Sequence, residues 1–436
     1  MQVVARQMAV RLHDAERDET TLPPSRHPAR HRHRQVARSS LMPAFAPTTP
    51  LPLFDEPVLA DPFPAYGTLR CTGAVVHLEE YGVWAVARHA DVAAILKTPD
   101  IFGSETGIAL TALANENVFA GTVFASDGAR HSRLRDVLAR QLAPRAMKAL
   151  AARIAARADH LVTMYTESGQ FDAVALARHM VCDTVMELIG LPGVDREVLL
   201  AGSAAVFDVF GPYGTRYEQG LPLASRMGQV LREKLTRETV EPGSWTSAIF
   251  DAVDAGQINE ADAVPLVWAY TIAAIDTTVL GLAECIVQLA RHPQQWQVLR
   301  REPVRWSVPA FHEALRLDAP IQGYGRLLTR AADIAGVHLD EGEQVWLLYG
   351  SAGRDPRHWR DDADQYDIRR RRNDQHLAFG GGPHLCAGIP LAELQARSIL
   401  RALTARCTHI TLNGEPTRVV SNLLRGYSHA GIAVEL

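Results

Sequence analysis

Cys386 lies between a run of glycines and the expected start of a helix, a position where a thiol can do chemistry. Glycines 380–382 and Pro383 suit neither a helix interior nor a central strand, so they predict a tight loop that approaches a bound group closely. Residues 391–403 have the apolar spacing of an amphipathic helix. The N–H groups and positive dipole end at such a helix start favour the thiolate form of Cys386. That sulfur could be a nucleophile, a metal ligand or an inert buried thiol.

The residues around Cys386 distinguish among these roles. The pattern Phe-Gly-x-Gly-x-His-x-Cys-x-Gly, residues 379–388, resembles the heme-binding signature of the cytochrome P-450 family at every fixed position. The resemblance implies that Cys386 is the thiolate ligand of iron in heme b, a ligation that favours O–O cleavage. It also implies a cofactor-binding role for five further residues of this loop: Phe379, Gly380, Gly382, His384 and Gly388.

Asp276 and Thr277 are the second pair that could do chemistry. They lie in the middle of an apolar stretch, 259–291, which predicts one long buried helix with a capping-box start at Asn259. A buried carboxylate is costly without a purpose, although the threonine could simply bond back to the helix and the aspartate pair elsewhere. The stretch resembles the family's acid–alcohol motif, which implies that both residues are catalytic and order water for proton delivery. Ala274 stands where the family most often has glycine, and it could narrow the oxygen groove.

Three basic residues resemble the family's binding groups for the heme propionates. His131 and Arg135 stand four residues apart, on one face of an expected helix, where an isolated pair would simply be solvated. Arg326 lies in an expected strand that begins near Gly323. The resemblance implies that all three hold propionate carboxylates.

Glu313 and Arg316 share a helix face at a spacing of three and can form an ion pair. This spacing is common by chance, but its order relative to the other motifs resembles the family's Glu-x-x-Arg pair. The resemblance implies a third partner in the segment before the cysteine loop. Arg369 is the best match for that structural role, although residues 370–372 are also arginines.

Length, composition and charge bound the remaining possibilities. The 436 residues are 47% apolar and 22% charged, an ordinary globular composition, and the resemblance implies one mainly α domain with small β-sheets over residues 42–436. Residues 1–41 are rich in Arg, His and Ser, and we expect a disordered basic extension. The chain carries a net charge of −4 despite that extension, so no nucleic-acid partner is expected. Five scattered cysteines without a CxxC pair indicate a reducing compartment, and we expect a cytoplasmic monomer without a membrane anchor.

The substrate prediction rests on analogy and on the roof loop. Segments at 61–89, 319–324 and 422–426 resemble bacterial members that demethylate methoxy-substituted aromatics, which bears on substrate only by analogy. Glu105 in the expected roof loop would repel a carboxylate ligand. A neutral, compact and mainly apolar substrate, such as a methoxyphenol or terpenoid, is therefore expected. The expected contact residues are Tyr270, Ala273, Ile321 and Leu423.

The resemblance implies a monooxygenase that hydroxylates or O-demethylates a small organic molecule with O2. No fused reductase is visible, so electrons are expected from a separate ferredoxin or flavodoxin with its reductase, and from NAD(P)H only indirectly. Two rival classes stay open. A peroxide-driven peroxygenase usually lacks the acid–alcohol pair, which Asp276 and Thr277 supply. A non-catalytic heme sensor would not need that pair, and it usually carries a signalling module that is not visible here.

Overall fold

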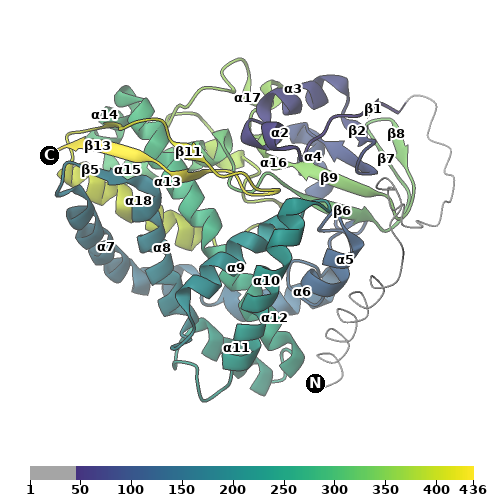
Figure 1. Ribbon diagram of the computed structural model, residues 1–436, viewed down its shortest axis with the longest axis horizontal. Helices are drawn as coiled ribbons and strands as arrows, with labels where there is room; N and C mark the ends of the chain where they lie inside the picture. Colours follow the sequence, from purple (N-terminus) through teal and green to yellow (C-terminus); the bar gives the residue numbers. More distant parts are fainter. Residues whose placement is uncertain (1–45) are drawn as a thin grey trace, which may run out of the picture. The chain divides into compact units, whose positions relative to one another are not determined.

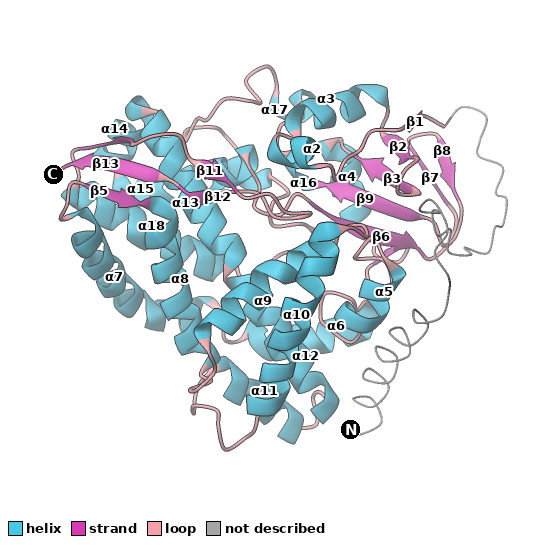
Figure 2. Cartoon of the chain, viewed as in Figure 1, coloured by secondary structure: helices cyan, strands magenta, loops and turns pink. Residues whose placement is uncertain are grey.

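The computed structural model describes residues 46–436, so the predicted extension at 1–41 lies outside the described residues. The described chain is mainly helical with small sheets, which confirms the expected fold class (Figures 1 and 2). The helices are α2 (Glu56–Ala60), α3 (Phe63–Thr72), α4 (His89–Leu96), α5 (Ala112–Ala114), α6 (Gly128–Ala139), α7 (Pro144–Thr166), α8 (Ala173–Ile189), α9 (Arg196–Val209), α10 (Thr215–Lys234), α11 (Trp245–Asp254), α12 (Glu260–Ala274), α13 (Asp276–Arg291), α14 (Pro293–Arg301), α15 (Pro303–Leu317), α16 (Tyr349–Ala352), α17 (Pro356–Trp359) and α18 (Ile389–Arg406).

The strands form a main sheet and three smaller ones. The strands are β1 (Thr48–Thr49), β2 (Val75–Leu78), β3 (Val83–Val86), β4 (Phe102–Gly103), β5 (Gln170–Asp172), β6 (Gly323–Leu328), β7 (Ala332–Ile334), β8 (Val337–Leu339), β9 (Gln344–Leu348), β10 (His409–Leu412), β11 (Thr417–Arg418), β12 (Tyr427–His429) and β13 (Gly431–Glu435). The main sheet has the order β1-β2-β3-β9-β6-β4, and it lies at the right of Figure 2, beside α2, α3 and α4.

Strand β9 fixes the register of the main sheet. Val345 pairs with Trp84 of β3 in the parallel direction and with Arg326 of β6 in the antiparallel direction. Residues of β9 and β3 are buried almost throughout, which suits their Val, Leu and Trp side chains. This pairing holds Arg326 at a fixed position in the interior, where it is 5% exposed.

The long helix expected over 259–291 is broken in two. Its start is as predicted, because the Asp262 carboxylate accepts the Asn259 N–H at 3.0 Å. At Ile275 the backbone leaves helical geometry, with ψ at −79°, and α12 ends where α13 begins. The hydroxyl of Thr277 donates to the Ala273 carbonyl at 2.7 Å. A hydroxyl that competes for a helix carbonyl in this way is a recognised cause of a bend.

Helix α13 forms the buried axis of the helical part. Residues 278–290 are all buried, and the helix packs against α8 on one side and α15 on another. The stretch Glu260–Arg291 is long and apolar enough to cross a membrane by length and composition, but 78% of its apolar window is buried inside the protein. Burial on all sides explains why this segment is so rich in apolar residues.

Candidate functional site

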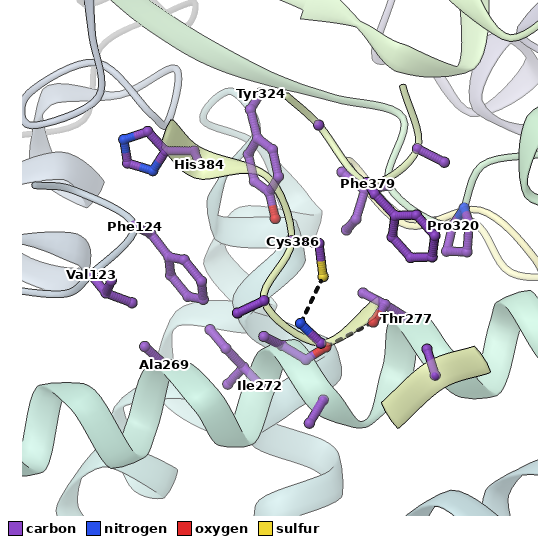
Figure 3. A pocket seen from close by; sticks show the side chains of 18 of the residues that line it. Val123, Phe124, Ala269, Ile272, Thr277, Pro320, Tyr324, Phe379, His384 and Cys386 are labelled. Carbon is purple, nitrogen blue, oxygen red and sulfur yellow. Dashed lines mark hydrogen bonds between the residues drawn. The ribbon is translucent and has the colours of Figure 1, made fainter. Parts of the chain in front are cut away.

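A deep cavity lies between the α12–α13 break and the loop that carries Cys386 (Figure 3). Its volume, counted as the space that the centre of a water molecule can occupy, is about 220 Å³. Figure 3 shows the Cys386 sulfur pointing into it, with Thr277 and Phe379 nearby. Most of the remaining wall is apolar or aromatic: Ile108, Val123, Phe124, Phe207, Phe210, Trp245, Ala269, Ile272, Ala273, Ala274, Phe311, Pro320 and Ile321.

The backbone of the cysteine loop is held on both sides of Cys386. Its own N–H donates to the Phe379 carbonyl at 2.9 Å, and its sulfur accepts the Gly388 N–H at 3.3 Å. Helix α18 starts at Ile389 with Pro390 in its first turn, so free N–H groups of the helix start face the sulfur. The residue order predicted this arrangement of loop and helix.

The expected thiolate character of Cys386 needs a correction. Burial raises the pKa of the Cys386 thiol above its ordinary value of 9.0, although the N–H groups of Gly388 and Ile389 and the Arg135 charge lower it. The sulfur is accessible from the cavity, but it lies deep in the protein, and desolvation outweighs the helix start. A bound metal deprotonates a coordinating thiol outright, so this environment is compatible with a ligand and unfavourable for a free nucleophile.

Two glycines of the loop adopt backbone conformations that other residues rarely take. Gly380 and Gly382 have φ values of +69° and +63°. A Cβ built on Gly382 would lie 2.0 Å from the Leu96 carbonyl oxygen at the end of α4, so a side chain has no room there. Gly380 and Gly388 line the cavity, whereas Gly382 serves this close contact with α4.

Four basic side chains line the cavity near the cysteine loop, and no Asp or Glu is among the described residues that line it. The ring centroids of His131 and His384 are 4.0 Å apart. Arg135 donates to the Leu385 carbonyl. Arg326 donates to the Gly325 carbonyl at 2.7 Å. A cluster of basic side chains with no acidic residue in the lining is suited to bind a group with two negative charges. The two propionates of heme would be such a group.

Burial and the neighbouring basic groups both disfavour the protonated form of His131. Burial, together with the charges of His384, Arg135 and Arg326, lowers the pKa of His131 to about 4. Outside the lining, Asp127 accepts from His384 at 3.3 Å, and Asp127 also binds the N–H groups of Ser104 and Glu105. The site therefore carries a surplus of cationic groups over carboxylates.

Asp276 and Thr277 lie at the helix break and face different ways. Thr277 lines the cavity, and its hydroxyl is bound to Ala273. Asp276 is not among the lining residues, and its Oδ2 atom is buried without a hydrogen-bond partner. Burial raises its pKa to about 6, while the nearby Ser203 hydroxyl and the Arg178 charge lower it. The Thr277 hydroxyl therefore faces the cavity, whereas the Asp276 carboxylate is buried away from it. A pKa near 6 suits this carboxylate to proton exchange near neutral pH.

The Glu313–Arg316 pair forms as expected, but the predicted third partner is wrong. Arg316 and Glu313 are both fully buried, with two hydrogen bonds of 2.9 and 2.8 Å between them. Arg370 donates to Glu313 at 2.9 Å, whereas the side chain of Arg369 is exposed. The chain turns here, with the Arg370 N–H donating to the Asp367 carbonyl at 3.0 Å, and this turn directs the Arg370 side chain to Glu313 while Arg369 stays exposed.

The expected substrate residues divide into two groups. Tyr270, Ala273 and Ile321 line the cavity. Leu423 does not line it, because its side chain is buried in the core and its carbonyl accepts from the Gln322 N–H at 3.0 Å. Glu105 is exposed and also absent from the lining, so the argument that it repels an acidic ligand is wrong.

An aromatic series along the cavity was missed at the sequence level. Phe210, Tyr324 and Tyr349 line the cavity, with ring centroids 5.2 Å apart for Phe210 and Tyr324 and 6.1 Å apart for Tyr324 and Tyr349. Phe119, which does not line the cavity, stacks on Phe210 at 3.9 Å. Tyr324 could have been found, because it stands two residues before Arg326 on β6 and therefore shares its face. Burial raises the pKa of Tyr324 and Tyr349, so both phenols are neutral.

Comparison with known proteins agrees with this site. The family profile for cytochrome P-450 matches residues 309–424. Cytochrome P-450 CYP199A2 from Rhodopseudomonas palustris is 36% identical over 371 residues, covering 84% of this chain and 89% of that protein. Erythromycin C-12 hydroxylase from Saccharopolyspora erythraea is 30% identical over 380 residues, covering 84% and 91%.

The solved structures give the same result for the fold. Cytochrome P-450 CREJ in complex with (4-ethylphenyl) dihydrogen phosphate superposes with a TM-score of 0.78 at 25% identity, covering 86% of this chain and 98% of that one. The sequence relatives are long, cover most of both chains and include a named hydroxylase. This chain therefore belongs to the cytochrome P-450 family and is a heme-dependent monooxygenase of organic substrates.

Proposed function

We propose that the enzyme hydroxylates or O-demethylates a neutral, compact and mainly apolar molecule, such as a methoxyphenol or terpenoid. The observation that carries this proposal is the distribution of charge in the cavity. All four basic lining residues lie near the cysteine loop, and their proposed partners are the heme propionates. The rest of the wall offers aliphatic groups, aromatic rings and neutral phenols. A substrate carboxylate there would be desolvated without a dedicated partner.

Heme b is the proposed cofactor, and nine residues would hold it or tune it. Cys386 would bind the iron, and His131, Arg135, Arg326 and His384 would bind the propionates. Phe379, Gly380, Gly382 and Gly388 shape the loop, with Gly388 also donating to the sulfur. Glu313 and Arg316, together with Arg370, would hold the segment before the loop. When bound, thiolate-ligated heme supplies oxygen activation, because the sulfur pushes electron density that favours O–O cleavage.

The proposed contribution of the chain to catalysis is positioning and proton delivery. Tyr270, Ala273 and Ile321 would hold the substrate against the cavity wall. Thr277 would orient water from its hydroxyl, and Asp276 would exchange the proton with that water because its pKa lies near 6. Such a relay supports an O2-driven reaction over a peroxide-driven one. Electrons would come from NAD(P)H through a reductase and a separate ferredoxin or flavodoxin, in the cytoplasm.

The test of this proposal uses ligands matched in shape and differing in charge. We expect guaiacol-like phenols or monoterpenes to shift the heme spin state of the ferric enzyme and to be turned over with coupled consumption of reducing equivalents. A methoxybenzoate with the same methoxy ring should bind at least tenfold more weakly, a difference of about 1.4 kcal/mol. Tight binding and coupled turnover of the benzoate, with the neutral ligands inert, would overturn the proposal.

An Ile321→Ala variant checks where the substrate lies. This change removes apolar volume from the cavity wall, so affinity for a compact ligand should fall while affinity for a bulkier terpenoid should rise. Leu423→Ala is the matched control, because that buried side chain does not line the cavity. It should lower stability through the cavity it leaves, by about 2–5 kcal/mol, without reversing the order of ligands.

A further inference from the structure

Glu393, His312 and His376 form a hydrogen-bonded chain beside the cysteine loop. Oε1 of Glu393, on α18, lies 2.9 Å from Nε2 of His312, on α15. Nδ1 of His312 lies 3.1 Å from Nε2 of His376, ten residues before Cys386. The two imidazoles are buried, and the Glu393 side chain is 31% exposed. The chain therefore leads from a solvent-accessible carboxylate to the interior.

The backbone fixes the direction of every proton in this chain. The Ala378 N–H, which can only donate, points at Nδ1 of His376 at 3.1 Å. Nδ1 of His376 must therefore be an acceptor, so its ring proton is on Nε2 and is donated to Nδ1 of His312. His312 then carries its own proton on Nε2 and donates it to Glu393. A single tautomer of each ring satisfies all three bonds.

The same polarity continues along the backbone to the proposed iron ligand. The peptide group that contains the Ala378 N–H also contains the Leu377 carbonyl, which accepts from Gly380 N–H at 2.8 Å. The next peptide group contains the Phe379 carbonyl, which accepts from the Cys386 N–H at 2.9 Å. Every donor in the series points toward Glu393. Hydrogen bonds aligned head to tail polarise one another, and this mutual polarisation is stronger in the low dielectric of the protein interior.

The surroundings keep the charge at one end of the chain. Burial lowers the pKa of His376 well below its ordinary value, and the nearby Arg316 guanidinium adds to this effect, so its ring is neutral. The Phe379 ring centroid lies 5.3 Å from that of His376 and 5.7 Å from that of His312. The bond between the two imidazoles is buried, whereas the bond to Glu393 is partly exposed. The carboxylate of Glu393 is then the one formal charge carried by the chain.

We propose that Glu393, His312 and His376 are positioning residues that convey the Glu393 charge to the Cys386 backbone and thereby lower the reduction potential of the heme. One electron from a reductant converts ferric to ferrous iron and adds negative charge at the ligand side. A Phe379 carbonyl made more negative by the chain disfavours that added charge. The inference rests on the proposed role of Cys386 as the iron ligand.

The experiment is a dye-mediated potentiometric titration of the heme-loaded enzyme. Glu393→Gln removes the charge and keeps the side-chain shape, and we expect the midpoint to rise. The one-electron reduction constant should increase by about three- to tenfold, and tenfold corresponds to about 59 mV. Asp374→Asn is the matched control. Asp374 is an exposed acid two residues before His376. Among the described residues, its carboxylate has no hydrogen bond to Glu393, His312 or His376. Removal of the Asp374 charge should change the one-electron reduction constant by less than twofold.

A second variant interrupts the chain in the middle. His312→Phe fills a similar volume beside Phe379 but removes both ring nitrogens. In this background Glu393→Gln should change the midpoint no more than Asp374→Asn does, because the carboxylate is no longer connected. If His312→Phe fails to retain heme, the comparison of the Glu393 and Asp374 variants decides alone.

Two results would overturn the inference. One is equal midpoint shifts for Glu393→Gln and Asp374→Asn. That result would mean that the shift comes from the loss of any nearby negative charge and not from the hydrogen-bonded series. The other is a Glu393→Gln shift that persists in the His312→Phe background. The reduced carbon monoxide spectrum separates these failures from failure of the ligand assignment. A wild-type enzyme without the thiolate band would refute the role of Cys386 itself.

Discussion

Arg370 places its Nε atom 2.9 Å from Oε1 of Glu313, on a carboxylate that Arg316 already binds with two hydrogen bonds. Glu313 and Arg316 are fully buried. One carboxylate thus serves two guanidinium groups, and Arg316 also donates to the Gly353, Ala363 and Gln365 carbonyls. The cluster joins α15 to the segment that leads into the cysteine loop.

Arg370→Ala should destabilise the enzyme strongly, because it breaks this buried cluster. Breaking a buried ion pair typically costs about 3–5 kcal/mol. We expect a lower melting temperature and a smaller fraction of purified protein with the thiolate spectrum. Arg369→Ala removes an exposed arginine from the adjacent position. Its free energy of unfolding should stay within about 0.5 kcal/mol of the wild-type value. Equal losses in the two variants would contradict the assignment.

Cys386→Ser should abolish the absorption band of the reduced carbon monoxide complex that gave the family its name, because a hydroxyl cannot supply the thiolate ligand. The measurement is the difference spectrum of purified, heme-reconstituted protein. Cys182→Ala and Cys407→Ala are the controls, since both thiols are buried away from the cavity lining. Either control losing the band while still folded would point to a different ligand.

Thr277→Ala should uncouple the enzyme. The variant should bind substrate with little change, but a larger share of the reducing equivalents should appear as hydrogen peroxide, because the hydroxyl at the helix break is lost. The ratio of product to NAD(P)H consumed measures this directly. Thr277→Ser should restore most of the coupling, and Thr278→Ala, one residue along, should keep it. Unchanged coupling in Thr277→Ala would assign proton delivery to another group.

Asp276 should make stability depend on pH in a defined direction. Its pKa is raised from 3.8 to about 6 in the folded protein. The folded state therefore holds this proton more tightly, and the associated stability is present below pH 3.8 and lost as pH rises through about 6. Between pH 4 and 7, the free energy of unfolding of the wild type should fall by on the order of 1–3 kcal/mol relative to that of Asp276→Asn.

Melting temperatures of the two proteins across that range measure this difference. Asp251→Asn is the control, because that carboxylate is exposed. A parallel pH profile for wild type and Asp276→Asn would mean that the buried carboxylate is better solvated than its surroundings indicate.

The proposed redox partner should dock near the exposed arginines of α6 and of the segment before the cysteine loop. Arg133, Arg140, Arg369, Arg371 and Arg372 are exposed there. An acidic ferredoxin would be steered by this local field despite the overall negative charge, so the reduction rate should fall steeply with added salt. Arg133→Ala should slow reduction at low salt, whereas Arg226→Ala on α10 should not. Salt-independent reduction would exclude this docking mode.

Much of the site was predictable, because its motifs are local. The spacing of residues 379–388 already defined a glycine loop ahead of a helix, and the structure brings Cys386, Thr277, His131, Arg135 and Arg326 to one cavity. The choice of Arg370 over Arg369 depends on the turn at residues 367–370, which four consecutive arginines conceal. The break at Ile275 was equally hidden, because a hydroxyl bond to Ala273 competes with an otherwise uniform helical pattern.

The histidine chain was hidden for a different reason. His312, His376 and Glu393 come from three separate segments, and no one-dimensional spacing relates them. Leu423 was misplaced for a similar reason, since the pairing of its carbonyl with Gln322 turns the side chain into the core. Contacts of this kind become visible only when the tertiary structure brings the segments together.

The contact between Gly382 and the Leu96 carbonyl has a consequence for biosynthesis. Leu96 leaves the ribosome long before Gly382 does, because most of the helices lie between them in the sequence. The cysteine loop must therefore dock onto a surface made long before it, and the apolar cavity wall stays uncovered until then. Cofactor capture must accordingly follow synthesis of the loop, and a nascent chain arrested before the loop should depend on chaperones to stay out of aggregates.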